Sequence, residues 1–344
     1  MARRIRTTSQ PNRLDEIRTS IERLLDTPLR SIAEDVKDQL EFLVTSAREC
    51  QQNAEILTVF LSQARAVLQL IPESFGDRFW FDAQMIAAIA DTWNGSDQHL
   101  SGTIVPKSAS QWAHESAYLT VGSGNERRKS LNVIHVPGRD DLDEIDLLAY
   151  PWLCHELAHN LFFYDDTFFI QTFRPNLDKF LGSLRLRAIA DHGSAKSKSH
   201  ALIARIESFW TPTLTHKNWA HEMAMDSVGL WTCGPAFLAA FQDEIEDKTR
   251  NPYHLDEVHP PYAVRAIGLI KASKELGWNK HVRRIKELLS VWRKSHWAKH
   301  VDNSYLALTE PQLIEATVEG TLATCQSLSL FKCTSTRFSE FNNN

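Results

Sequence analysis

Apolar residues recur every three or four positions through much of the first hundred residues, with charged residues between them. This spacing is typical of amphipathic helices, and each apolar stripe needs a partner to cover it. The pattern is clearest in residues 14–24, 32–47 and 56–71. We therefore predict a helical N-terminal region over residues 1–100. Its helices pack on each other or on the rest of the chain, or they form a docking or regulatory surface for a protein partner.

The pattern changes after residue 100, where short β-prone runs are separated by glycines and charged residues. These runs lie at residues 103–105, 117–121 and 131–136. A helical pattern returns after Pro137 and Gly138 and continues for most of the remaining chain. We predict an α+β, mainly α fold, with a small β-sheet in a domain of residues 101–300. A C-terminal helix and a frayed tail are expected in residues 301–344.

Charge and composition narrow the classes of function. The chain has 344 residues, of which 43% are hydrophobic, and a formal net charge of -5. These values fit a chain with a packed core, and the acidic balance makes a dominant nucleic-acid role unlikely. A local patch at Arg283 and Arg284, or at the N-terminal arginines, is nevertheless able to contact phosphate. A nucleic-acid-associated protease therefore remains a third, weaker interpretation.

The cellular compartment that we expect follows from the use of cysteine and from the lack of long apolar stretches. The five cysteines are scattered and form no CxxC pair, which disfavours a disulfide framework and a thiolate zinc cluster. No stretch reaches the roughly 18 apolar residues that a membrane span needs. The N-terminus is basic, but no apolar segment of a signal peptide follows it. We therefore expect a cytoplasmic protein with no membrane span.

The strongest chemical signal is an HExxH motif formed by His155, Glu156 and His159. It lies in Trp152–Tyr164, a run without glycine or proline that follows Pro151, a residue suited to the first turn of a helix. Positions four apart lie on one face of a helix, so both imidazoles can reach one zinc ion (Zn²⁺). Glu156 is one position round the helix, from which its carboxylate can reach a metal-bound water.

A third zinc ligand must come from elsewhere in the chain. A metzincin needs glycine and histidine at positions that hold Phe162 and Asp165, so that class is excluded. Downstream, Glu222 and Asp226 are four residues apart on a second predicted helix. Glu222 can ligate zinc while Asp226 accepts a hydrogen bond from the outer nitrogen of a ligating histidine. His221 is a rival ligand, but it lies about 100° round the helix and would leave Asp226 without a role.

Three motifs follow each other along the chain in an order that is specific enough to suggest a family. HELAH is followed by ExxxD at Glu222–Asp226 and by His259–Pro260–Pro261 with Arg265 after it. This succession resembles the gluzincin metallopeptidases of the HtpX and CaaX-prenyl-protease group, over roughly residues 115 to 270. The chain lacks the membrane spans that are common in that group.

The resemblance implies a role for each matching residue. It implies that the zinc ligands are His155, His159 and Glu222. By the same matching, Glu156 resembles the general base and Asp226 the carboxylate that orients a ligand. His259 resembles the histidine near the substrate, and Arg265 the arginine that braces the site. In that group a strand before the HExxH helix binds extended substrate, which points to residues 117–121 or 131–136.

These observations predict a zinc-dependent endopeptidase that acts on a protein or peptide substrate. Three protein ligands leave a fourth zinc position open, which is typical of catalytic sites and not of structural ones. The alternative is a helical protein-interaction module with a structural or vestigial metal site. Glu156 separates the two interpretations, because a vestigial site commonly loses its general base.

Overall fold

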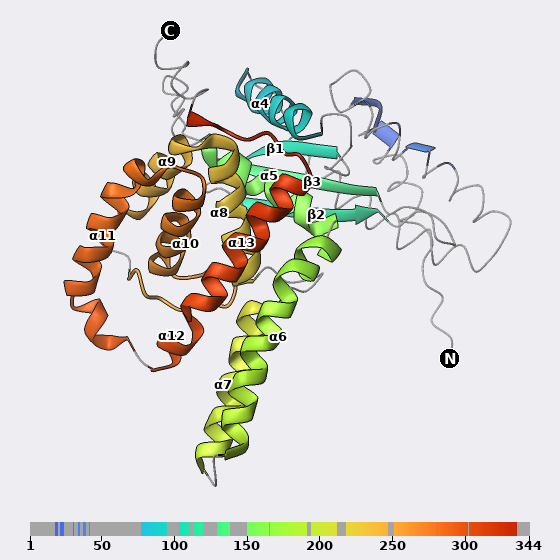
Figure 1. The fold of residues 1–344 in the computed structure, drawn as a ribbon. Helices are drawn as coiled ribbons and strands as arrows, with labels where there is room; N and C mark the ends of the chain where they lie inside the picture. The colour runs from blue at the N-terminus through green and yellow to red at the C-terminus, as the bar shows by residue number, and fades with distance from the viewer. Residues whose placement is uncertain are drawn as a thin grey trace, which may run out of the picture. The chain divides into compact units, whose positions relative to one another are not determined.

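The fold is taken from a computed structural model (Figure 1). It describes residues 77–94, 103–109, 113–119, 129–137, 150–164, 166–190, 194–211, 218–246, 251–301 and 303–335, with isolated positions between 18 and 41. Helices account for most of these residues, which confirms the mainly α class. Most of the predicted N-terminal helical region and the tail after residue 335 lie outside the described residues.

The chain divides into two compact units. One unit comprises Met1–Ile86 with Ser101–Asp140, and the other Ala87–Leu100 with Asp141–Asn344. Helix α4 (Asp77–Asn94) crosses the boundary between them. No helix among the described residues is long and apolar enough to cross a membrane.

The described strands belong to the first unit. They are β1 (Thr103–Ala109), β2 (Ala113–Leu119) and β3 (Lys129–Pro137), in the order β1-β3-β2. Strand β1 runs parallel to β3, with Val105 opposite Val133, and β2 runs antiparallel to β3. Ile134 and Val136 of β3 are buried, as expected for alternate residues that point to one face of a sheet.

The second unit is helical. Its helices are α5 (Pro151–Tyr164), α6 (Asp166–Ala190), α7 (Ser194–Trp210), α8 (Trp219–Cys233), α9 (Pro235–Ile245), α10 (Tyr262–Glu275), α11 (Arg283–Lys294), α12 (Asn303–Leu308) and α13 (Pro311–Ser327). Helix α8 packs against α5, α10 and α13, while α6 and α7 run side by side (Figure 1). Helix α13 contacts both α8 and α6 and belongs to this unit.

Helices α5 and α8 are buried almost all round. All residues from Pro151 to Leu161 and from Trp219 to Trp231 are buried. A helix without an exposed face normally carries apolar residues only, because a buried charge is costly unless it is paired. These two helices nevertheless carry the five polar residues of the predicted zinc site. Their presence in the core therefore calls for a functional explanation.

Local signals fix the ends of α8. The Asn218 side chain accepts a hydrogen bond from the backbone N–H of His221, which caps the first turn. Gly234 ends the helix at φ 57°, and a Cβ there would lie 2.8 Å from Cys333 Sγ. Glu222 lies in the first turn, where the helix dipole favours a negative charge.

Two helical glycines offer a matched test of the packing around α8. A Cβ at Gly229 would lie 2.4 Å from the ring of the buried Phe237, whereas nothing lies within 4 Å of a Cβ at Gly182 in α6. We expect Gly229→Ala to lower the free energy of unfolding by about 1–3 kcal/mol through overpacking. Gly182→Ala should raise it by up to about 1 kcal/mol through helix propensity. Urea denaturation of both variants checks this, and equal effects would contradict the packing of α9 on α8.

Candidate metal centre

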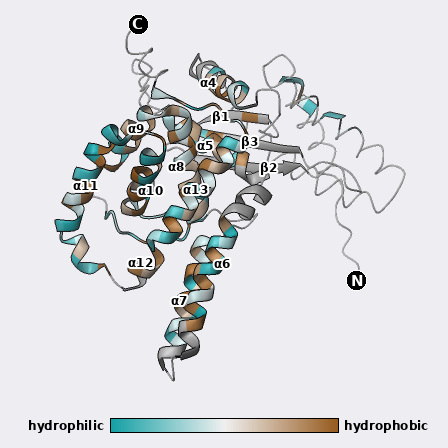
Figure 2. Cartoon of the chain, viewed as in Figure 1, coloured by the Kyte–Doolittle hydropathy of each residue, from teal (hydrophilic) through white to brown (hydrophobic). Residues whose placement is uncertain are grey.

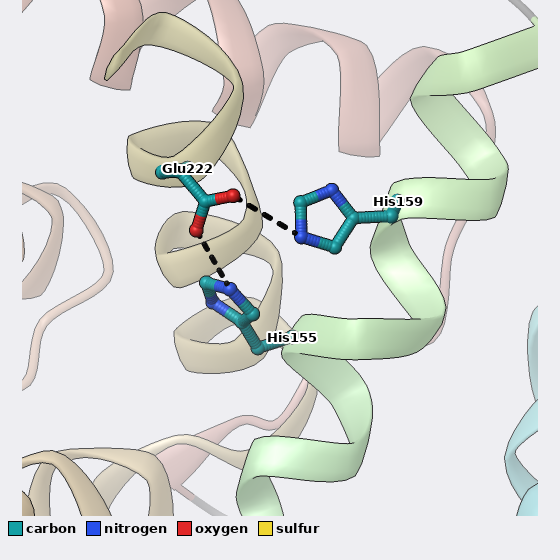
Figure 3. Close-up of side chains that lie close together, drawn as sticks. All are labelled: His155, His159 and Glu222. Carbon is teal, nitrogen blue, oxygen red and sulfur yellow. Dashed lines mark ion pairs between the residues drawn. The ribbon is translucent and has the colours of Figure 1, made fainter. Parts of the chain in front are cut away.

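The two predicted ligand helices bring three potential ligands together. His155 and His159 project from α5 toward Glu222 of α8, whose carboxylate directs one oxygen at each imidazole (Figure 3). His155 Nε2 lies 3.3 Å from Glu222 Oε2, and His159 Nε2 lies 3.5 Å from Glu222 Oε1. One ligand atom from each residue falls within 4.8 Å of the others. The helical spacing of the two motifs thus leads to one convergent, buried cluster.

The spacing of these atoms leaves room for a metal ion between them. Zn–N and Zn–O bonds of about 2.0–2.1 Å place the ligand atoms of a tetrahedral site about 3.3 Å apart. The two His–Glu distances of 3.3 and 3.5 Å, each to a different oxygen of Glu222, are close to this value. Both exceed the usual 2.7–3.2 Å of an N–H···O hydrogen bond. The cluster therefore suits a shared ion better than a direct hydrogen bond.

Asp226 contacts the ring nitrogen of His155 that does not face Glu222. His155 Nδ1 lies 3.0 Å from Asp226 Oδ1, so the ring can donate from Nδ1 and keep the Nε2 lone pair for a ligand. Arg265 of α10 donates from Nε to Asp226 Oδ2 at 2.8 Å and from Nη2 to Asp226 Oδ1 at 2.6 Å. This two-pronged contact fixes the carboxylate, which in turn fixes the imidazole.

The rings around Arg265 complete its support. The guanidinium carbon lies 5.3 Å from the ring centre of Trp152 and 5.6 Å from that of Phe241. Trp152 also meets the His155 ring edge-on, with 5.4 Å between ring centres. The arginine is therefore held by cation–π contacts as well as by its ion pair.

The electrostatics of the cluster favour a cation between its ligands. Burial alone would lower the pKa of His155, but its contacts with Asp226 and Glu222 outweigh burial and raise that pKa to about 9. Burial opposes ionisation of Asp226, yet Arg265 and His155 hold the pKa of Asp226 below its ordinary value. Asp226 thus stays ionised, and the site stabilises positive charge on its histidine.

The formal charges of the buried side chains also favour a cation in the cluster. The buried carboxylates here are Glu156, Glu222 and Asp226, and the buried guanidinium is Arg265. With His155 protonated, as its raised pKa favours without a metal, these groups leave a formal charge of minus one in the core, and with both histidines neutral, as metal ligands must be, they leave minus two. Such an imbalance is strongly unfavourable away from water. A divalent cation neutralises it, so the donor set fits a resident metal ion.

The other predicted residues fall into two groups. Glu156 is 6% exposed and near enough to His155 to raise the pKa of that histidine, so it belongs to the buried cluster. Arg265 reaches the site through Asp226. His259, by contrast, is exposed, and its ring nitrogen lies 3.7 Å from Asp256 Oδ1 in the turn before α10. Arg265 is therefore in contact with the cluster, whereas the contact of His259 lies in an exposed turn.

The sequence did not reveal two further contacts beside the motif. One is the aromatic support from Trp152 and Phe241, because nothing in the sequence pairs these rings with an arginine. The other joins Cys154 and Cys233, whose sulfur atoms lie 3.2 Å apart and link α5 to α8. The two cysteines are 79 positions apart. No local spacing could have indicated that contact.

Comparison with known proteins gave no match to any family model, curated protein or solved structure. The resemblance to the gluzincins therefore stays a prediction carried by the motif residues. What the described residues add is the geometry of the cluster.

Replacing Asp226 with asparagine tests the support of the cluster. Asparagine is nearly isosteric, but it leaves the buried Arg265 without its countercharge and removes the carboxylate behind His155. We expect metal affinity to fall about 10- to 100-fold. The metal-free protein should lose about 3–5 kcal/mol of unfolding free energy. Competition with a chromogenic chelator and urea denaturation in EDTA measure the two effects separately. Unchanged values in both assays would show that Asp226 supports neither the ligand nor the core.

Proposed function

We propose that the chain is a zinc-dependent endopeptidase with a zincin-like core of the gluzincin type. The observation that carries the proposal is the buried convergence of His155, His159 and Glu222 with Glu156 one residue from the first ligand. Two imidazoles and a carboxylate favour zinc over magnesium or calcium, which prefer oxygen ligands alone. Three protein ligands also leave a position open, as catalytic sites require.

The zinc ion, when bound, supplies a Lewis acid that lowers the pKa of water and polarises a peptide carbonyl. The protein does the rest with its own residues. The Glu156 carboxylate accepts a proton from the attacking water and delivers it to the leaving amine. Asp226 keeps His155 in the tautomer that presents Nε2 to the metal, and Arg265 keeps Asp226 ionised and oriented. The substrate is a protein or peptide chain in this proposal.

The alternative is a helical interaction module whose metal site is structural or vestigial. Structural zinc sites usually have four protein ligands, whereas the described residues supply a cluster of three. Glu156 is also retained in the core, where a buried carboxylate without a task would only destabilise the fold. Both observations favour the enzyme. The free thiols of Cys154 and Cys233 fit the reducing, cytoplasmic compartment that we propose for it.

A chelation and reconstitution experiment tests the proposal. The purified full-length chain is stripped with EDTA, dialysed, and reconstituted with Zn²⁺ or with Mg²⁺. Cleavage is followed with a quenched-fluorescent, unfolded protein substrate and located by mass spectrometry. We expect hydrolysis to vanish on chelation and to return with Zn²⁺ alone. Stoichiometric zinc without hydrolysis would favour the structural alternative, and hydrolysis that survives chelation would overturn the metal mechanism.

A further inference from the structure

A strongly basic segment lies apart from the metal cluster in sequence. We define it as residues 279–300, which comprise the 3-10 turns η3 (Asn279–Val282) and η4 (Trp297–His300) with α11 between them. Glu287 is its one acidic residue. Its exposed basic side chains are Lys280, Arg283, Arg284, Lys286, Arg293, Lys294 and Lys299. The basic segment therefore has a formal charge of about plus six in a chain of net charge -5, so positive charge is concentrated here.

The basic segment places its charges on one side of α11. Ile285 and Leu289 are buried, and they mark the face of α11 that packs inward. At 100° per residue, Arg283, Arg284 and Lys294 lie on the opposite half of the helix. Lys286 and Arg293 lie beside the buried face, both on the same flank. Figure 2 accordingly shows α11 as a largely hydrophilic helix. The face with Ile285 and Leu289 is thus already used by the fold, and the outer face presents cations together with Val291.

Most of these cations have no acidic partner among the described residues. Arg283 pairs with Glu287, and Arg284 with Glu246, both as exposed ion pairs. The basic residues without a salt bridge to any described residue are Lys280, Lys286, Arg293, Lys294 and Lys299. Five uncompensated charges in one segment repel each other. A bound polyanion would relieve that repulsion.

An aromatic pair follows the charged helix directly. The rings of His296 and Trp297 lie 4.1 Å apart between centres, tilted by 39°. Trp297 is half-buried and His296 is exposed, so part of this stack faces the solvent. An accessible aromatic face beside a row of cations is the combination on which single-stranded nucleic acid binds, because bases stack on the ring while phosphates contact the cations.

We propose that the basic segment binds single-stranded nucleic acid, with phosphates along α11 and a base on Trp297. The eleven residue steps from Arg283 to Lys294 span about 16 Å, and the five cations of the segment without a salt bridge to a described residue provide about five phosphate contacts. A membrane surface is less suitable, because Val291 is the one large apolar side chain that α11 exposes, which is too little apolar area for insertion. An acidic protein would use the cations but not the stacking ring.

Two double variants with the same change in net charge test the assignment. Lys286→Glu with Lys294→Glu reverses charges on α11, whereas Lys179→Glu with Lys198→Glu reverses exposed charges on α6 and α7. Binding of a fluorescein-labelled single-stranded oligonucleotide is measured by anisotropy over a range of salt concentrations. For the natural chain we expect a slope of log affinity against log salt near about -3.5, which corresponds to about five phosphate contacts. The α11 variant should bind about tenfold or more weakly, with a slope reduced by about 1.4.

The controls decide between the possible partners. The α6/α7 variant should bind like the natural chain, and an equal loss in both variants would reduce the effect to net charge and overturn the site. Trp297→Ala should weaken binding of the single strand more than that of a duplex, and Trp297→Phe should restore it. Equal or tighter binding to polyglutamate, or to vesicles containing phosphatidylserine, would overturn the assignment in favour of those partners. Because the assay is binding and not hydrolysis, its outcome is independent of the proposed peptidase activity.

Discussion

Replacing both His155 and His159 with alanine is expected to abolish metal binding. Zinc sites gain about 10–16 kcal/mol from their full ligand set, so the loss of two of three protein ligands should weaken affinity by about 1,000-fold or more. The natural chain should retain about one zinc ion per chain after dialysis against metal-free buffer. The double variant should retain almost none. Elemental analysis by inductively coupled plasma mass spectrometry measures this directly.

A matched variant controls for the general loss of histidines. His200→Ala with His254→Ala removes two exposed imidazoles outside the cluster and should leave the zinc content unchanged. Glu222→Gln provides a second route, because it removes the third ligand without changing the size of the side chain. Circular dichroism establishes that each variant is folded before its zinc is counted. Full zinc retention in the His155/His159 variant would show that the metal, if any, binds elsewhere.

The ligand cluster could be predicted because most of its geometry is local. An interval of four residues places His155 and His159 on one face of a helix, and the same interval relates Glu222 to Asp226. Pro151 marks the start of α5 in the structure, as it does in the sequence. Helical periodicity therefore determined which side chains share a face. The spacing does not show that the two helices contact each other. That contact was inferred from chemistry, because a zinc site needs a third ligand.

Contacts between distant segments could not be predicted in the same way. The ion pair of Arg265 with Asp226 spans 39 positions and depends on how α10 packs against α8. The resemblance to a family suggested an arginine that braces the site, but not that it would hold both carboxylate oxygens between two aromatic rings. His259 differs from Arg265 in this respect. The resemblance suggested a position near the substrate, but the motif gave no information about the exposure of the side chain. The turn held by Asp256 determines that instead.

The buried polar cluster also implies a balance between stability and function. A core of α5 and α8 filled with apolar side chains would avoid the desolvation of three carboxylates and a guanidinium. The ion pair and hydrogen bonds around Asp226 offset part of that penalty, and a bound divalent cation offsets the charge that remains. If the proposed metal binds, it should therefore also stabilise this unit.

The replacement of Glu156 by glutamine is expected to separate metal binding from catalysis. Glutamine has nearly the same shape, but it cannot accept a proton from water at neutral pH. If Glu156 is the general base, the rate of peptide hydrolysis should fall about 100- to 10,000-fold. The zinc content should stay at that of the natural chain, because the ligands His155, His159 and Glu222 are unchanged. Removing a buried carboxylate should also leave the fold as stable as before, or more so.

The measurement compares three proteins on the same unfolded substrate, each with its zinc content determined. Glu257→Gln serves as the matched control, since it removes an exposed carboxylate of the turn before α10 and should hydrolyse at the natural rate. Hydrolysis by Glu156→Gln at the natural rate, with zinc bound, would remove Glu156 from the mechanism. Loss of zinc together with activity would instead assign Glu156 to holding the site. Full zinc content with almost no turnover is the predicted combination, and only a proton-transfer role produces it. The same variant should then retain uncleaved substrate long enough for its isolation.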